Sequence, residues 1–131
     1  MGAVNLVNVS SILMQNGGWQ LDAVGSATAI FTVDADKVAK INAIYLCNTQ
    51  ATDETVNLSL SGINTSGVGT TFVTDTLATP SLLTTVSVPA NTTIQVIDNP
   101  IYLLEADTMS AFGGASDNDL HIFASWEAFT D

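Results

Sequence analysis

The sequence predicts an all-β fold, an antiparallel β-sandwich of jelly-roll type with an N-terminal arm or edge strand. Strand-forming Thr, Val and Ile are abundant, whereas the helix formers Glu, Lys, Arg and Gln are scarce. Short apolar runs alternate with turn residues at intervals of about 8–12 residues, which is typical of sandwiches. With 131 residues the chain is long enough for one domain with its own core.

The first 18 residues are expected to form an arm that packs on a neighbouring subunit or the first edge strand, and residues 19–131 the sandwich. The segment is apolar and uncharged, follows no clear helical or strand period, and ends at Gly17-Gly18. Its apolar side chains, with Phe129 from the other end of the chain, are the candidate subunit interface. The N-terminal members are Val4, Leu6, Val7, Val9, Ile12, Leu13 and Met14.

Four strands are expected next, over residues 19–24, 27–33, 39–48 and 55–61. The last of these alternates most clearly, with Val56, Leu58 and Leu60 on the buried face. A short polar link joins the last two strands, so they are expected to form a hairpin. In the strand over 39–48, one shared face is expected to carry Ala39, Ile41, Ala43, Tyr45 and Cys47.

The second half repeats this pattern, with a loop over 61–69 and strands over 70–74, 82–88, 92–98 and 101–104. Pro89 and Pro100 fall between apolar runs, where a missing N–H disturbs pairing least. A strand over 108–112 is expected to pair with one over 119–129 across a Gly-rich turn. The final strand places on one face Leu120, Ile122, Ala124, Trp126 and Ala128. The nine aromatic residues are spread singly along the chain and are interpreted as core.

The charge balance excludes several partners. Thirteen acidic residues face two basic ones, giving a net charge of −11, and the chain has no arginine. Nucleic-acid binding needs Lys and Arg to replace counterions on phosphates, and anionic membranes attract basic segments, so neither partner is expected. The acids fall mainly in predicted turns. Lys37 and Lys40 are the only basic groups available to pair with an acidic neighbour.

No residue pattern indicates catalysis, a cofactor or a metal site. Cys47 has no histidine near it in sequence and is interpreted as a buried hydrophobe, and the single His121 as a structural strand residue. The pairs Asp34-Ala35-Asp36 and Asp117-Asn118-Asp119 could hold Ca²⁺, but neither continues into a full ligand series, so turn stabilisation is the preferred interpretation. Glu105 and Asp107 form another acidic turn. The protein is therefore not expected to be an enzyme.

Several segments resemble small β-sandwich virion proteins of tailed bacteriophages, especially those of cyanobacterial and marine hosts. The similarity spans roughly residues 37–129. It lies in a strand ending Tyr45-Leu46-Cys47-Asn48-Thr49, a Pro89-centred turn, a strand Pro100-Ile101-Tyr102-Leu103-Leu104 that leads into an acidic turn, and a final strand ending Trp126-Glu127.

The resemblance implies a virion structural subunit, of which a capsid cement or decoration protein is the leading type. Its partners would be the major capsid protein or other virion proteins, and copies would form a homo-oligomer such as a closed trimer. A neck, tail, baseplate or fibre component is one alternative. Another is a carbohydrate-binding module at a receptor-binding tip. No secretory leader or apolar membrane span is expected, so assembly would occur in the host cytoplasm and the protein would reside in the virion.

Overall fold

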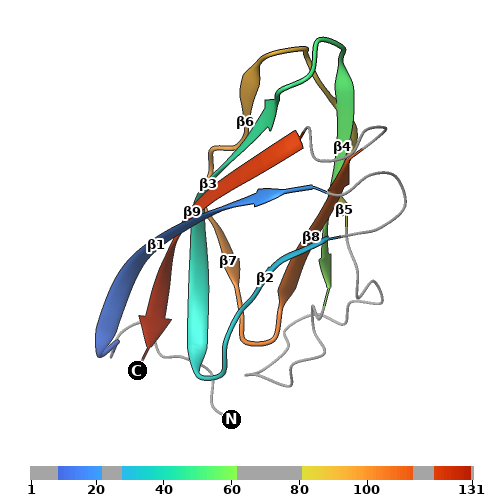
Figure 1. The fold of residues 1–131 in the computed structure, drawn as a ribbon. Coiled ribbons are helices and arrows are strands. Elements are labelled where there is room, and N and C mark those ends of the chain that lie inside the picture. The colour runs from blue at the N-terminus through green and yellow to red at the C-terminus, as the bar shows by residue number, and fades with distance from the viewer. Residues whose placement is uncertain (1–8, 22–27, 62–80, 114–119, 131) are drawn as a thin grey trace.

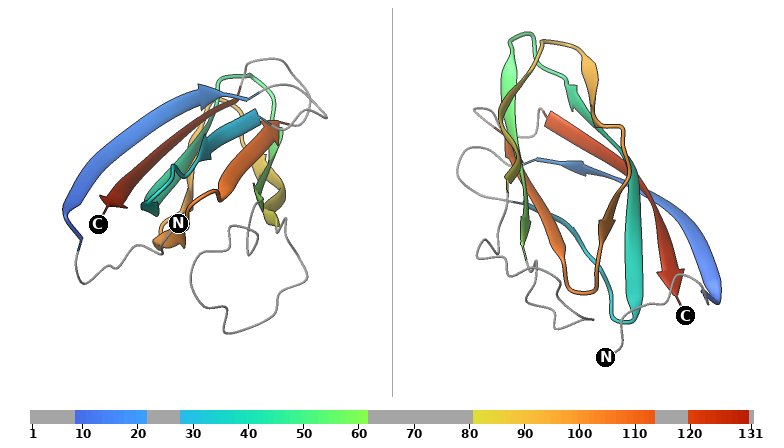
Figure 2. Two further views of the ribbon diagram at one scale, coloured as in Figure 1. Left: turned by 90° about the horizontal axis from the view of Figure 1, so that it is seen from below. Right: turned by 180° about the vertical axis from the view of Figure 1, so that it is seen from behind.

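The computed structural model describes residues 9–21, 28–61, 81–113 and 120–130, which form nine strands in two sheets (Figure 1). The five-stranded sheet contains β1 (Ser11–Gln20), β3 (Lys37–Asn48), β6 (Thr93–Ile97), β7 (Ile101–Leu103) and β9 (Leu120–Thr130). The four-stranded sheet contains β2 (Thr28–Thr32), β4 (Glu54–Ser61), β5 (Ser81–Val88) and β8 (Thr108–Gly113). Two further views show the sheets as separate layers (Figure 2).

The strand order confirms the predicted fold class. The five-stranded sheet runs β1-β9-β3-β6, with β7 also paired to β3, and the four-stranded sheet runs β2-β8-β4-β5. Strands β6 and β7, which precede and follow Pro100, pair with successive parts of β3, so they act as one interrupted strand. The pairing is then nested, first strand with last and second with second-to-last. This is the topology of a jelly roll.

Both predicted hairpins are wrong. Strands β3 and β4 lie in different sheets, and so do β8 and β9, so each link crosses from one layer to the other. Sheets in a sandwich pack about 10 Å apart, a distance that a short polar link spans as easily as it closes a hairpin. Link length alone therefore could not distinguish the two connections.

Asn48 holds the crossing between β3 and β4. Its side chain is 1% exposed, and Nδ2 donates to the carbonyls of Thr52 at 2.8 Å and Val88 at 3.0 Å. Its Oδ1 accepts the Gln50 amide at 2.8 Å. The buried amide is thus satisfied on both sides, which ties the turn after β3 to the end of β5.

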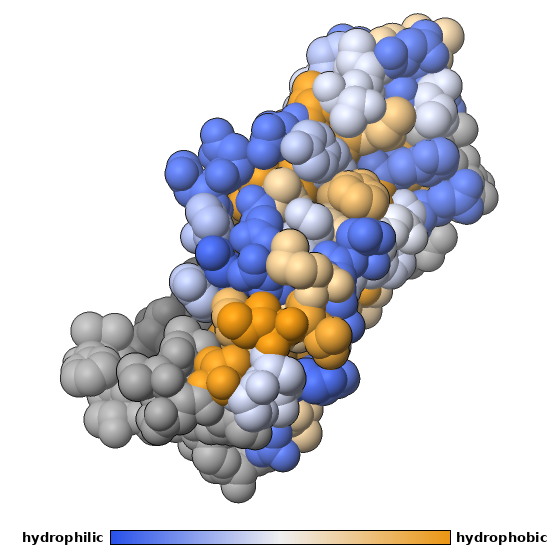
Figure 3. All heavy atoms as spheres, turned by 90° about the vertical axis from the view of Figure 1, so that its left-hand side faces the viewer, coloured by the Kyte–Doolittle hydropathy of each residue, from blue (hydrophilic) through white to orange (hydrophobic). Residues whose placement is uncertain are grey.

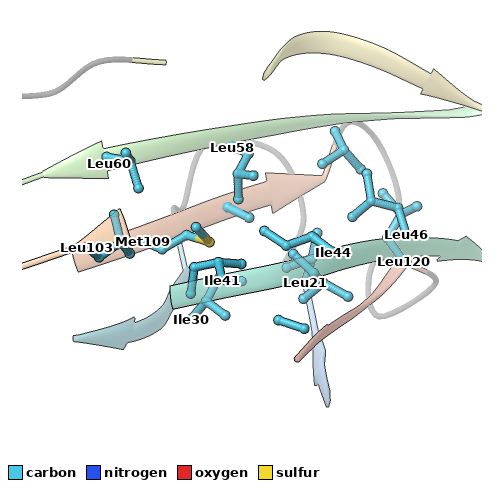
Figure 4. Close-up of a cluster of buried hydrophobic side chains, with 14 of the residues drawn as sticks. Leu21, Ile30, Ile41, Ile44, Leu46, Leu58, Leu60, Leu103, Met109 and Leu120 are labelled. Carbon is cyan, nitrogen blue, oxygen red and sulfur yellow. The ribbon is translucent and has the colours of Figure 1, made fainter. Parts of the chain in front are cut away.

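The core lies between the sheets and is built from aliphatic side chains of both (Figure 4). The predicted alternation of β4 is confirmed, since Val56, Leu58 and Leu60 are buried. The inward face of β9 is also confirmed, with Trp126 partly buried against the core. The fully buried large hydrophobic side chains are Leu21, Ile41, Ile44, Leu46, Leu58, Leu103, Met109, Leu120, Ile122, Val56 and Val88.

The predicted face of β3 is wrong in its second half. A register shift against β9 falls between Ile41 and Ala43, where the alternation changes phase. Ile41 is buried before the shift, Ile44 and Leu46 after it, and Tyr45 is 37% exposed. Cys47 is correspondingly half-buried rather than a core residue.

Some expectations fall on residues outside those that the structure describes. These are the strand over 70–74, the loop over 62–69, residues 22–24 of the strand over 19–24, and the pair Asp117 and Asp119. The edge strand β1 begins at Ser11 and continues past Gly17-Gly18 to Gln20.

Candidate interface on the five-stranded sheet

The candidate interface residues that the structure describes gather at the start of β1, an edge strand. Ile12 is 57% exposed, Leu13 53% and Met14 72%. Phe129 lies opposite Ile12 in the β1–β9 register and is half-buried. We call Ile12, Leu13, Met14 and Phe129 the apolar edge. Figure 3 shows hydrophobic side chains gathered at one end of the face that carries β1.

The other candidate residues are less informative. Val4, Leu6 and Val7 lie outside the described residues, and Val9 is half-buried. Ser10, which follows Val9, donates its amide to the Thr130 carbonyl at 2.7 Å and its hydroxyl to the same oxygen at 3.0 Å. The chain is therefore already held against β9 before β1 begins.

The second half of β1 is held by aromatic packing that closes the gap between the sheets. The Trp126 ring stacks on Phe31 of the other sheet at 5.2 Å between centroids, and on Trp19 at 6.1 Å. The Trp126 Nε1 donates to Gln15 Oε1 at 2.7 Å. The ring of Trp19 folds over Gly17, where an added Cβ would lie 2.7 Å from the ring. Glycine at this position therefore leaves the space that the indole occupies.

The apolar edge is electrically neutral on a strongly acidic protein. Strand β1 contains no charged residue. The carboxylate beside it, Glu127, lies opposite Met14, and its Oε2 is 3.9 Å from the Lys40 Nζ. The other lysine, Lys37, pairs with Asp34 at 3.4 Å. Partly exposed pairs of this kind add little stability, but Lys40 compensates the charge of Glu127, the residue opposite Met14.

An open hollow of about 280 Å³ lies on the same sheet, beside the second half of β1. Phe123 and Tyr45 lie opposite each other in register with ring centroids 6.4 Å apart, and Phe123 is 44% exposed. The Nε2 of Gln20 lies 3.5 Å from the Nε2 of His121 at its rim. The interpretation of all aromatics as core is therefore wrong for Tyr45 and Phe123, and for Tyr102, which is 53% exposed.

Two acidic turns lie at the end of the strands opposite the hollow, and their carboxylates accept hydrogen bonds from backbone amides. Asp107 is 4% exposed, and its Oδ2 accepts the Leu104 amide at 2.9 Å. Burial raises the pKa of the Asp107 carboxyl, and the hydrogen bond from Leu104 opposes that shift. Glu105, which is also buried, accepts the Asp36 amide at 3.2 Å. Asp36 has a φ of 59°, a turn conformation that Asp tolerates.

Within the described residues, no group of three or more His, Cys, Asp or Glu side chains is arranged to hold a metal ion. No helix that these residues form could cross a membrane. The hollow on the five-stranded sheet is lined mainly by apolar and aromatic side chains.

The chain matches no protein-family model and no curated protein sequence. Its fold is similar to a structure described as Bacillus endospore appendages that form disulfide-linked pili, with 16% identity and a TM-score of 0.49 over 92% of this chain and 88% of that one. It is also similar to a T13 viral particle of IBDV, with 11% identity and a TM-score of 0.49, and to infectious bursal disease virus Gt strain, with 11% identity and a TM-score of 0.35. The two viral matches span 93% and 92% of this chain but only 32% and 33% of the viral chains. At these scores the likeness adds nothing about function.

Proposed function

We propose that the protein is a non-enzymatic structural subunit of a bacteriophage virion, most specifically a capsid cement or decoration protein that stabilises the head shell. The observation that supports this most is the neutral apolar edge on a protein of net charge −11. A protein of this kind acts by burying surface in a neighbour, and needs no catalytic residue. Binding that favours the assembled shell stabilises it by mass action.

The apolar edge can supply useful binding energy. Its exposed side chains already bury part of their surface, and covering the remainder contributes on the order of 1 kcal/mol for each residue. Because the edge carries no unpaired charge, docking incurs little desolvation cost. The exposed acids Asp34, Asp36, Asp53 and Asp98 stay in water and keep the free subunit soluble.

The test is the copy number of the protein in purified particles, measured by quantitative mass spectrometry and located by electron microscopy. A decoration protein is present in hundreds of copies spread over the shell. A dozen or fewer copies at one vertex or along the tail would contradict decoration and support the alternative of a neck, tail, baseplate or fibre component.

Variants separate attachment from folding. Replacement of Met14 by Asp is expected to weaken attachment to undecorated shells, because it places a charge within the apolar edge. Replacement of the exposed Leu104 by Asp is the matched control, since Leu104 lies in the turn after β7 and outside the apolar edge. Equal loss of attachment by both variants would argue against docking through the apolar edge.

A second candidate function, carbohydrate binding at a receptor-binding tip, is favoured by the hollow beside β1. Exposed aromatic rings can stack on the apolar faces of sugar rings, and Gln20 and His121 provide hydrogen-bonding groups at the rim. A glycan array probed with the purified protein tests this function. Binding that Tyr45→Ala abolishes, with folding retained, would support it, whereas an array without signal would exclude the glycans displayed.

A further inference from the structure

The four sheet edges formed by the described strands differ in how they are protected against further strand pairing. Exposed edges are usually short, bulged, or interrupted by proline, because an open edge offers unpaired backbone groups. Strand β2 has only five residues and a register shift against β8. Strand β5 has two register shifts against β4 and a positive φ at Thr85. Strands β6 and β7 are separated by Pro100.

Strand β1 has none of these protections. It is ten residues long, contains no proline or charged residue, and pairs with β9 without a register shift. In the part of the chain that the structure describes, β9 is its only strand partner. The uninterrupted edge is therefore suited to accept another strand.

The backbone phase of β1 specifies which residues face the open edge. The amide of Leu21 donates to the Leu120 carbonyl at 2.9 Å, and residues in an antiparallel pair alternate between bonding to the partner and facing away. With the unbroken register, odd-numbered residues of β1 bond to β9. Ile12 and Met14 therefore direct their amides and carbonyls outward.

The side chains of this segment are self-complementary. The sequence Ser10-Ser11-Ile12-Leu13-Met14-Gln15-Asn16 reads polar, polar, apolar, apolar, apolar, polar, polar in either direction. We propose that β1 pairs antiparallel with β1 of a second copy about a two-fold axis at Leu13, forming one sheet across both subunits. Ile12 then faces Met14 of the other copy, and the two Leu13 residues face each other.

This register agrees with both the backbone and the charge. It makes Ile12 and Met14 a hydrogen-bonded pair, as their outward amides require, and the two Leu13 residues a non-hydrogen-bonded pair. The same face is used by both copies, as in an isologous dimer. The Lys40–Glu127 pair leaves the edge neutral, so two acidic subunits can approach there with less repulsion than elsewhere. The proposal rests on the apolar edge being a subunit interface, and it names a second copy, in place of direct contact with the shell, as the neighbour that covers this edge.

Cysteine crosslinking tests the register. Residues of a non-hydrogen-bonded pair lie about 4.5 Å apart between Cα atoms, which is within the range of a disulfide. In a Cys47→Ser background, Leu13→Cys is expected to form a covalent dimer rapidly under mild oxidation. Gln20→Cys in the same background is the control, because Gln20 is exposed on β1 but lies far from the axis.

Sedimentation equilibrium tests the association itself, with a concentration series from about 1 to about 300 µM because a single strand pair gives a small interface of low affinity. The unmodified protein is expected to form dimers that strengthen with added salt, which screens the like charges of the subunits. Leu13→Asp places two carboxylates on the axis and is expected to raise the dimer Kd at least tenfold. Gln20→Asp adds the same charge elsewhere on β1 and is expected to change the Kd by less than about twofold. Circular dichroism confirms that each variant is folded.

Three results would overturn the proposal. They are a monomer over the whole series, a dimer that Leu13→Asp leaves intact, and crosslinking of Gln20→Cys as fast as that of Leu13→Cys. Incorporation into the virion is a separate question, and the copy number in purified particles answers it. A monomer present in hundreds of copies would remove the two-fold pairing and leave the proposed function standing.

Discussion

Strands β1 and β3 belong to the same sheet, and both carry runs of large apolar residues, but they bury them very differently. In β3, Ile41, Ile44 and Leu46 are completely buried. In the first half of β1, Ile12 and Met14 are more than half exposed. Strand β3 lies in the middle of the sheet between β9 and β6, whereas β1 lies at its edge.

The difference shows that similar apolar residues can have two different roles in one sheet. The four-stranded sheet covers the inner side of β3, so its apolar side chains stabilise the folded monomer. At the start of β1 the side chains remain in water, where they contribute little to folding. They are free to contribute to association instead. Five predictions test this division, from the largest expected effect to the smallest.

The largest effect is expected from truncation in β3. Ile44→Ala removes a fully buried side chain and is expected to lower the free energy of unfolding by about 2–5 kcal/mol. Urea denaturation followed by tryptophan fluorescence measures it. A loss below about 1 kcal/mol would mean that the centre of the sheet packs less tightly than its burial indicates.

Within β1 itself, the two adjacent glycines distinguish the packed half of the strand. Gly17→Ala would place a Cβ 2.7 Å from the Trp19 ring and is expected to cost about 1–3 kcal/mol. Gly18→Ala meets only the Ile122 carbonyl at 3.7 Å, an ordinary contact, and is expected to be close to neutral. Thermal unfolding of the two variants gives the comparison. Equal melting temperatures would contradict the stacking of Trp19 over Gly17.

The anchoring of β3 is tested at Asp107, because the turn that contains it hydrogen-bonds to the segment leading into β3. The Val33 amide donates to the Asp107 carbonyl at 3.0 Å, and the Ala106 amide donates to the Val33 carbonyl at the same distance. Asp107→Ala leaves the Leu104 amide without its acceptor and is expected to cost about 1–3 kcal/mol. Asp107→Asn retains an acceptor and removes a buried charge, so no destabilisation is expected at neutral pH.

The same residue gives a pH dependence of defined sign. Because the pKa of Asp107 is raised in the folded state above its ordinary 3.8, the folded protein binds this proton before the unfolded chain does. The stability of the native protein relative to Asp107→Asn should therefore increase as pH falls through the raised pKa, and level off below 3.8. Denaturation curves of both proteins between neutral pH and pH 3 measure this difference. The opposite slope would show that the hydrogen bond from Leu104 outweighs burial.

The smallest effect on folding is expected from the apolar edge. Met14→Ala is expected to change the free energy of unfolding by less than about 0.5 kcal/mol, since the side chain is already 72% exposed. The same substitution is expected to weaken self-association, which sedimentation equilibrium measures. A large loss of stability without any effect on association would assign Met14 to the core of the monomer.

Prediction from the sequence succeeded where local pattern and burial agree. The alternation of Val56, Leu58 and Leu60 identified the buried face of β4, because this strand keeps one phase along its length. It failed for Tyr45, because a register shift against β9 reverses the phase of β3 after Ile41. No local signal marks that shift, since it depends on fitting β3 to a partner about 80 residues away in the chain.

That Ile12, Leu13 and Met14 form a subunit interface stays a prediction, but part of the surface that they make could be predicted from the sequence. The apolar, uncharged character of residues 11–14 was evident from composition, and the structure places Ile12, Leu13 and Met14 together on an edge strand. The hollow with Tyr45 and Phe123 was missed, because the two residues meet only through the pairing of β3 with β9. Period-two alternation places residues on a face but does not say whether a second sheet covers that face.

The sequence by itself determined the class of structure: strand-forming residues, turns at regular spacing and few charges in the strands leave a β-sandwich as the solution that buries the apolar faces. It also determined that the surface is acidic and that basic groups are scarce. Only the tertiary structure decided which strands pair, which apolar residues are covered and which edge remains open. These are properties of contacts between segments far apart in the chain, and the free energy that selects them comes from their joint packing rather than from any one segment.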